Sequence, residues 1–326
     1  MRKIEYLSPT SIAKFEENVD DFYLWYLVEK RPPKVPQTQP MSVGSAFDAF
    51  VKSYLHQNLF GKGKDPRFDL IALFEAQVEQ RNRDFAYGAG KHCFEVYQKC
   101  GALSDLMIHL SSAVGEPRFE LEVRGVINGY REGVTMTREG VVLLGKPDVF
   151  FINAHGAHVV IDWKVSGYCS DYGASPLPGY VSIRNDPKQN DQHRDACPMM
   201  MNGIMVNIAT YLEYYRSDWA TQLAIYGWLC GEEIGHEFIV GIDQLACRHG
   251  SIRVAQHRTR VSAAYQWKVF ARAQQIWEIV HSNHIFRDLS PEDSKARCEL
   301  LDKQAEILCQ DGDERDRWFA QVTRGM

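Results

Sequence analysis

The stretch HVVIDWKV (residues 158–165) determines how the rest of the chain is interpreted. Its β-branched residues predict a strand, and the side chains of a strand point alternately to the two faces of a sheet. Ile161 and Trp163 then share one face, and Asp162 and Lys164 share the other. Burying either charge alone costs several kcal/mol, so each needs a partner. The stretch therefore predicts a carboxylate and an ammonium group side by side near the end of an apolar strand.

A second apolar segment precedes this strand. Residues 149–152 (VFFI) follow Asp148, and a turn at residues 153–157 separates them from the first stretch. Two strands joined by so short a turn are expected to pair as an antiparallel hairpin, which brings Asp148 close to Asp162. Two neighbouring carboxylates repel each other, and a divalent cation between them removes the repulsion. The alternative is a purely structural ion pair of Asp162 with Lys164 on a surface strand.

Helical and strand-rich regions are expected to follow one another along the chain. Residues 1–112 are predicted to be helical, and Ser8-Pro9 is a typical helix start, with serine as the cap and proline at the first position. Residues 113–261 contain the expected strands and a long loop at about 167–203. Residues 262–326 are again expected to be helical. This order predicts the α/β class, with a central mixed sheet flanked by helices, helical additions at both ends and one compact unit.

The composition is that of an ordinary globular protein. The 326 residues are 45% hydrophobic, and 37 Lys and Arg stand against 42 Asp and Glu, for a net charge of −5. This excludes a histone-like polycation but not a nucleic-acid enzyme, which binds phosphates through local patches. The sequence has no run of about 18 apolar residues and no apolar signal-peptide core, so we expect no membrane-spanning helix and a cytoplasmic location. The eight cysteines form no Cys-x-x-Cys pair and are expected to be free thiols.

Five short motifs, taken in order, resemble a known family. They are LSPTS (7–11), GSAFD (44–48), GKPD (145–148), DWK (162–164) and QLAIY (222–226). GKPD, thirteen further residues and DWK resemble the signature of the PD-(D/E)XK nuclease superfamily. The other three motifs resemble its RecB-like branch, which includes the RecB nuclease domain, CRISPR adaptation nucleases and lambda-type exonucleases. The resemblance spans about residues 7–230 and implies a restriction-endonuclease-like core within residues 113–261.

The resemblance also implies roles for single residues. Asp148 and Asp162 would ligate one or two Mg²⁺ or Mn²⁺ ions, which are hard cations that prefer oxygen ligands. The main-chain carbonyl of Trp163 would complete the coordination. Lys164 would orient or deprotonate the attacking water and stabilise charge on the scissile phosphate, while the metal polarises the phosphoryl oxygen. Asp148, Asp162 and Lys164 are thus the expected catalytic residues.

The sequence departs from the family pattern in two places. The RecB-like branch usually has histidine where this chain has Asp48. A carboxylate also binds a hard cation, so Asp48 is expected as a further metal ligand, and a solvated surface carboxylate is the alternative. Many relatives hold an iron–sulfur cluster with one early cysteine and three near the C-terminus. Here the first cysteine is Cys93, and only Cys298 and Cys309 lie near the C-terminus, so no iron–sulfur cluster is expected.

Two groups of residues are expected to contact nucleic acid. Gln222 and Tyr226 are one turn apart on a predicted helix and share a face. The resemblance directs them at the site or at the DNA backbone, and plain core packing is the alternative. The densest basic run, residues 248–260, includes Arg253 and Arg258 and is expected to follow a phosphate backbone. Some of its side chains are expected simply to face solvent.

These observations favour a metal-dependent deoxyribonuclease. Within that class we expect an exonuclease or end-processing enzyme that acts on linear or single-stranded DNA ends in recombination or repair. The sequence has no phosphate-binding loop of the ATPase type, so any unwinding would come from a partner such as a helicase or recombination protein. One alternative is a non-catalytic DNA-binding subunit on a degenerate nuclease fold, which the aspartate at position 48 motivates. Another is a structural protein in which the Asp162–Lys164 pair is incidental.

Overall fold

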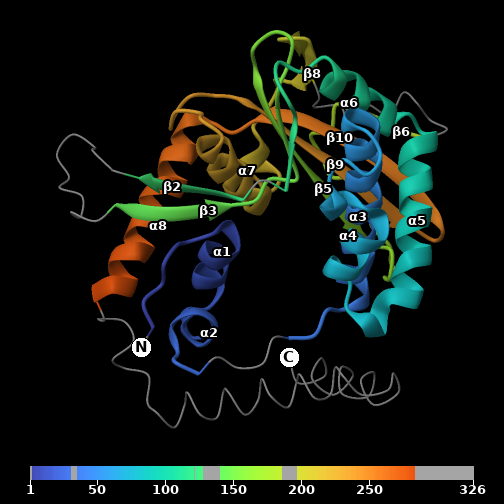
Figure 1. Cartoon of the computed structure of the whole chain (residues 1–326). Coiled ribbons are helices and arrows are strands. Elements are labelled where there is room, and N and C mark those ends of the chain that lie inside the picture. The colour runs from blue at the N-terminus through green and yellow to red at the C-terminus, as the bar shows by residue number, and fades with distance from the viewer. Residues whose placement is uncertain (1, 31–34, 121, 128–139, 186–196, 283–326) are drawn as a thin grey trace. The chain divides into compact units, whose positions relative to one another are not determined.

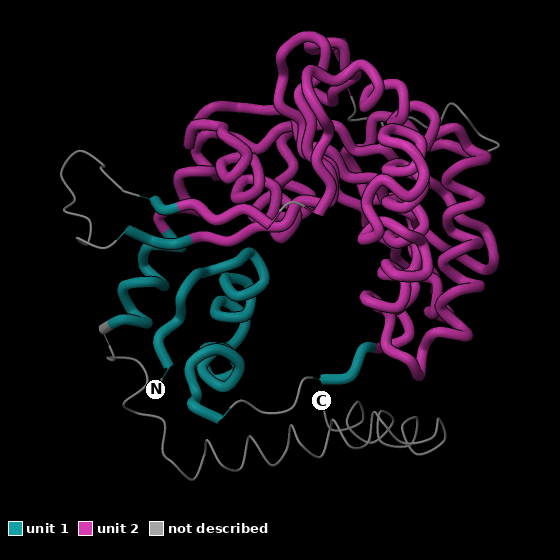
Figure 2. Tube along the Cα trace, viewed as in Figure 1, with its two compact units in different colours: residues 1–37, 126–142, 272–326 teal, residues 38–125, 143–271 magenta. Residues whose placement is uncertain are grey.

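The computed structural model describes residues 2–30, 35–120, 122–127, 140–185 and 197–282. The chain divides into two compact units (Figure 2). The smaller comprises residues 1–37, 126–142 and 272–326, and the larger comprises residues 38–125 and 143–271. The regions expected from the sequence follow chain order, whereas these units combine segments that are distant in the sequence.

The larger unit is built on a six-stranded sheet (Figure 1). Its strands, in spatial order, are β1 (Arg118–Phe119), β4 (Val149–Ile152), β5 (His158–Ser166), β9 (Ile239–Arg248), β10 (Ser251–Arg260) and β6 (Ser182–Arg184). Strands β5 and β9 are parallel, and the other neighbouring strands are antiparallel. The sheet is therefore mixed, as the sequence predicted.

Helices cover both faces of this sheet (Figure 1). One face carries α3 (Gln39–Phe60), α4 (Leu70–Gln77), α5 (Arg83–Lys99) and α6 (Ala102–Ser111), and the opposite face carries α7 (Ser217–Leu229). Within β5, Ile161 and Trp163 pack into the core with residues of α3 and α5. Val160 packs into the core with residues of α7. The α/β class, with a central mixed sheet flanked by helices, is confirmed. Asp162, two residues after Val160, lies on the same α7 side of the sheet.

Further elements accompany the main sheet and its covering helices. They are the 3₁₀-helices η2 (Pro66–Phe68), η3 (Gln80–Asn82) and η4 (Leu212–Tyr214), the two-stranded sheets β2 (Val123–Ile127) with β3 (Val141–Gly145) and β7 (Pro198–Met201) with β8 (Ile204–Asn207), and helix α8 (Ala263–Ser282). No helix among the described residues is both long enough and apolar enough to cross a membrane.

The smaller unit starts with three short helices. They are α1 (Pro9–Glu17), α2 (Val19–Phe22) and the π-helix η1 (Tyr23–Leu27). Ser8 and Ser11 form a reciprocal cap at the start of α1, because the hydroxyl of each accepts a hydrogen bond from the backbone N–H of the other. Pro9 occupies the first helical position, where its missing N–H costs no hydrogen bond. The helix start predicted at Ser8-Pro9 is confirmed.

The expected loop at 167–203 is partly wrong. Strand β6 lies within it and pairs with β10 at the edge of the main sheet. Strand β7 begins at Pro198 and pairs with β8 across a turn at Asn202-Gly203, where both residues have positive φ, 48° and 76°. Such a turn suits a tight hairpin. A strand of three residues, Ser182–Arg184, is too short to leave a periodic signal in the sequence. Residues 186–196 of this stretch lie outside the described residues.

Candidate active site

Pairing of β4 with β5 brings the two predicted carboxylates together. Val149 lies opposite Ile161, so Asp148, which immediately precedes β4, comes to the position opposite Asp162. The backbone N–H of Trp163, the residue after Asp162, donates a hydrogen bond to Oδ2 of Asp148 at 3.3 Å. The hairpin therefore builds the acidic pair that the sequence led us to expect.

Lys164 completes this pair on the α7 side of the sheet. Its Nζ lies 2.5 Å from Oδ2 of Asp162, two residues earlier on the same face of β5. The carboxylate is almost fully buried, with a side-chain exposure of 5%, whereas the lysine side chain is 29% exposed. The ammonium group thus lies at the boundary between a buried acid and the solvent.

Gln222 and Tyr226, from α7, face the same two groups. The amide oxygen of Gln222 accepts a hydrogen bond from Lys164 at 3.1 Å, and its amide nitrogen lies 3.3 Å from Oδ1 of Asp162. The same nitrogen donates to the Tyr226 hydroxyl at 3.1 Å. Burial raises the pKa of Tyr226 to about 12, so its phenol remains protonated. Both residues therefore belong to the polar site, and plain core packing does not describe Gln222.

A second acidic group lies on the α3 side of Asp148. Asp48 and Lys52 are one turn apart on α3, and Nζ of Lys52 lies 2.7 Å from Oδ2 of Asp48. The same ammonium lies 2.9 Å from Oδ1 of Asp148 and also contacts Oε1 of Glu120. Lys146 contacts the other oxygen of Glu120. The Asp48 side chain is only 17% exposed, so this residue is not a solvated surface carboxylate.

Lys52 and Glu120 were not anticipated from the sequence. The spacing of Asp48 and Lys52 was a usable signal, because residues four apart on a helix form ion pairs. No comparable signal existed for Glu120, because residues 119–123 (FELEV) alternate apolar and acidic side chains as an ordinary strand does. The strand is in fact interrupted there, because β1 ends at Phe119 and Glu120 has a left-handed backbone with φ of 52°. Such a conformation is costly for a non-glycine residue and is found mainly where structure or function requires it.

The pKa values of the acidic groups differ because their surroundings differ. Burial raises the pKa of Asp48 to about 7, against the opposing charge of Lys52. Burial and the charge of Asp148 raise the pKa of Asp162 well above its usual range. Burial also acts on Asp148, but the charge of Lys52 and the hydrogen bonds it accepts hold its pKa below the usual value. Burial thus opposes ionisation of Asp48 and Asp162, and a positive charge close to either carboxyl group favours it.

These residues fit a divalent cation. Ligand oxygens of Asp48, Glu120 and Asp148 all lie within 4.8 Å of one another. Oδ1 of Asp48 is buried and has no hydrogen-bond partner among the described residues. Purely carboxylate donors suit a hard cation such as Mg²⁺ or Mn²⁺. A cavity of about 280 Å³ opens onto this group and is lined by Asp48, Gln77, Glu120 and Asp148 among others. The role of the Trp163 carbonyl as a ligand stays a prediction.

The basic run 248–260 divides into an exposed and a buried part. Arg258 is buried, and its guanidinium lies 2.6 Å from Oδ1 of Asp243. Gly241 lies directly opposite on β9, and its lack of a side chain leaves room for the arginine. The prediction that Arg258 contacts DNA is therefore wrong, because both faces of this central strand are covered. Arg253 is partly exposed, and its contact with DNA stays a prediction.

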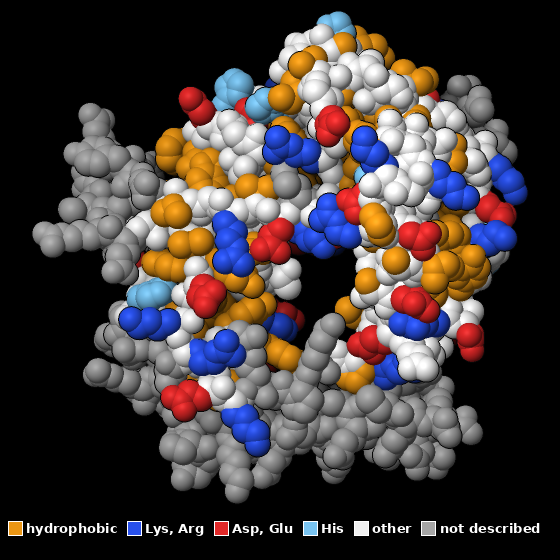
Figure 3. Space-filling model, in the orientation of Figure 1, with side chains coloured by type: hydrophobic (Ala, Val, Ile, Leu, Met, Phe, Trp, Pro, Cys, Tyr) orange, Lys and Arg blue, Asp and Glu red, His pale blue; other side chains and the backbone are white. Residues whose placement is uncertain are grey.

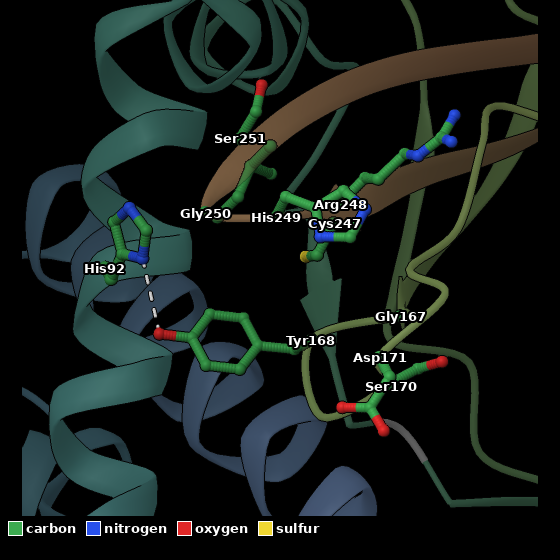
Figure 4. Close-up of a pocket in the computed structure, with 11 residues that line it drawn as sticks. His92, Gly167, Tyr168, Ser170, Asp171, Cys247, Arg248, His249, Gly250 and Ser251 are labelled. Atoms are coloured by element: carbon green, nitrogen blue, oxygen red, sulfur yellow. Dashed lines mark hydrogen bonds between the residues drawn. The ribbon is translucent and has the colours of Figure 1, made fainter.

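The exposed part of the run borders a second cavity, of about 370 Å³, at the turn between β9 and β10 (Figure 4). His92 of α5 and Tyr168 close one side of it, joined by a hydrogen bond of 3.3 Å. Arg248 and His249 lie on the opposite side, and the guanidinium of Arg248 points away from the His92–Tyr168 pair. On the visible face of the larger unit, acidic and basic side chains are interspersed rather than gathered by sign (Figure 3).

Comparison with known proteins gives limited information. No family model matches the sequence, and no curated protein matches it. Among solved structures, a "putative exonuclease" from Eubacterium rectale is 12% identical, with a TM-score of 0.42, over 89% of this chain and 88% of that chain. The protein SSO0001 is 13% identical, with a TM-score of 0.26, over 86% of this chain and 96% of that chain. TM-scores this low identify no family, so function is argued from the site.

Proposed function

We propose that this chain is a divalent-metal-dependent deoxyribonuclease with the site organisation of the PD-(D/E)XK superfamily. One observation carries the proposal. Asp148 and Asp162 face each other across β4 and β5, and Nζ of Lys164 lies 2.5 Å from the second carboxylate. A buried acidic pair beside a partly exposed amine is an arrangement suited to phosphodiester hydrolysis, since it combines cation binding with a positive group for the phosphate.

Each side chain has a defined task in this proposal. Asp148 and Asp162 would hold the cation, with the main-chain carbonyl of Trp163 and the carboxylate of Asp48, which lies near that of Asp148, as further ligands. A bound Mg²⁺ or Mn²⁺ supplies Lewis-acid polarisation of the phosphate and a water that ionises near neutral pH. Lys164 places its ammonium beside the scissile phosphate and orients the attacking water. Gln222 keeps that ammonium in place, because it bonds both to Lys164 and to Asp162.

The finer assignment is an exonuclease or end-processing enzyme of the RecB-like branch, active on linear or single-stranded DNA ends during recombination or repair. The sequence motifs support this assignment, together with the position of Gln222 and Tyr226 at the site. Tyr226 and Arg253 would contact the DNA backbone. A helicase or recombination protein would supply opened ends.

The alternative is a non-catalytic DNA-binding subunit on a degenerate nuclease fold. Two features motivate this alternative. Asp48 replaces the histidine usual in the RecB-like branch, and the acidic group on the α3 side is already paired with the Lys52 ammonium. This alternative predicts DNA binding without cleavage under any divalent metal.

Digestion of end-labelled linear DNA and closed circular DNA with Mg²⁺, Mn²⁺ or EDTA tests the proposal. Cleavage of linear DNA alone is the expected result, and nicking of the circle indicates an endonuclease instead. Asp162→Ala and Lys164→Ala should abolish cleavage while circular dichroism stays unchanged. Asp218→Asn is the matched control, since Asp218 is an exposed acid of α7 that pairs with Arg216. Binding without cleavage supports the non-catalytic alternative, and neither binding nor cleavage overturns both.

A further inference from the structure

Lys52 is the most deeply buried charge of the candidate site, yet the proposed mechanism gives it no task. Its side chain is 1% exposed. An ammonium group has three N–H donors. Here three carboxylates surround it, with Oδ2 of Asp48 at 2.7 Å, Oδ1 of Asp148 at 2.9 Å and Oε1 of Glu120 in direct contact. The hydrogen-bonding capacity of Lys52 is therefore filled entirely by acidic groups from three separate segments.

The ammonium lies where a metal ion would be expected. The three acids are the group whose ligand oxygens lie within 4.8 Å of one another, and Nζ is the centre they share. Mg²⁺ holds its oxygens at about 2.1 Å, nearer than an ammonium does, so an ion and Nζ cannot occupy this centre together. Lys52 thus already supplies the positive charge that this part of the cluster needs.

Asp148 connects this centre to the catalytic pair. Its Oδ1 faces Lys52, and its Oδ2 accepts the hydrogen bond from the backbone of Trp163, on the side of Asp162. In two-metal nucleases two ions lie about 3.5–4 Å apart and act together on the phosphate. The corresponding arrangement around Asp148 has an ammonium on one side and the Asp162 carboxylate on the other.

We propose that Lys52 holds the place of a second metal ion, so that the chain binds a single divalent cation, between Asp148 and Asp162. This inference rests on the proposed function of the same site. The charges agree with it. The site contains four carboxylates and three ammonium groups, which leave one formal negative charge. The carboxylates are those of Asp48, Glu120, Asp148 and Asp162, and the ammonium groups are those of Lys52, Lys146 and Lys164. One bound divalent cation makes the formal charge of the site positive. The site then attracts a phosphodiester without a second ion.

Counting bound Mn²⁺ on the full chain, by calorimetry without DNA, tests this inference. Wild type should bind one ion. Lys52→Met should bind two, or one at least tenfold more tightly, because the three acids lose their internal cation. Lys91→Met is the matched control and should still bind one ion with unchanged affinity, since Lys91 is a 56% exposed lysine of α5 that pairs with Glu95, outside the site.

A second variant keeps the test valid if Lys52→Met does not fold. Lys52→Met with Glu120→Gln removes one negative charge together with the ammonium, and it should also gain a second ion. Two ions in the wild type, or no added ion and no tighter binding in either Lys52 variant, overturn the inference. The function is judged separately by DNA cleavage. A wild type that cuts DNA with two ions refutes only the inference, and one that binds a single ion without cutting refutes only the nuclease.

Discussion

Lys52 and Asp148, 96 residues apart in the sequence, meet with 2.9 Å between Nζ and Oδ1. This contact joins the helix-side cluster of Asp48 and Glu120 to the strand-side pair of Asp162 and Lys164. Asp148 therefore contributes to both halves of the site, one oxygen to each. Any change at this carboxylate is expected to affect both halves at once, which distinguishes it from the other acids.

Asp162→Asn should stabilise the metal-free protein and remove its response to Mn²⁺. The amide cannot repel Asp148, so we expect the free energy of unfolding in EDTA at pH 8 to rise by about 1 kcal/mol. In wild type, Mn²⁺ at 100 times its dissociation constant should raise the free energy of unfolding by about 2.7 kcal/mol, because the ion binds only the folded state. Denaturant unfolding with and without Mn²⁺ measures both. A large loss of metal-free stability in the variant would argue against the acidic pair.

Gln222→Leu should lower the cleavage rate by about 10- to 100-fold, the range typical for residues that orient catalytic groups. The cause is loss of the bonds that hold Lys164 and Asp162 in place. Single-turnover cleavage of end-labelled DNA measures the rate. Gln275→Leu, at an exposed helical position, should leave it unchanged. Equal rates for wild type and Gln222→Leu would show that Gln222 does not position the site.

Arg258 and Arg253 should behave in opposite ways when changed to methionine. Arg258→Met leaves Asp243 as a buried unpaired charge and should cost about 3–5 kcal/mol of stability. Adding Asp243→Leu should recover part of this loss, since both charges are then removed.

Arg253→Met should cost less than about 1 kcal/mol of stability and should weaken both DNA binding and the dependence of that binding on salt. Urea unfolding and fluorescence-anisotropy titrations provide the two measurements, and a mild stability effect at Arg258 would refute its structural role.

His257 should make the protein sensitive to acid. Burial and, to a lesser extent, the charge of Arg258 lower the pKa of this histidine to about 3, against the opposing charge of Asp243. The unfolded chain takes up a proton near pH 6.5, whereas the folded chain does so only near pH 3. Stability is therefore complete above pH 6.5 and falls as the pH drops below it. From pH 6.5 to pH 5 the loss should be about 2 kcal/mol.

The variant His257→Gln isolates this effect. It should lose about 2 kcal/mol less than wild type between pH 6.5 and pH 5, whatever its absolute stability. His155→Gln, at an exposed position, should keep the wild-type pH dependence. Urea unfolding at both pH values measures the difference, and equal slopes for wild type and His257→Gln would contradict the assigned burial.

The sequence by itself determined the local geometry of the strand-side pair. Side chains of a strand alternate between two faces, which placed Asp162 and Lys164 together and away from Trp163. A short turn forces consecutive strands to pair, which brought Asp148 opposite Asp162. Gln222 and Tyr226 shared a face because a helix repeats every 3.6 residues. All these relations depend on bonds and spacings within short segments of the chain.

Only the tertiary structure decided what surrounds that pair. Lys52 reaches Asp148 because α3 packs against the sheet, and Glu120 reaches Lys52 because the chain turns with positive φ after β1. Arg258 is basic in sequence but buried in the fold, because Gly241 and Asp243 on the neighbouring strand supply space and opposite charge. Such contacts join residues far apart in the chain, and their stability depends on burial and partner charge, which no local pattern encodes.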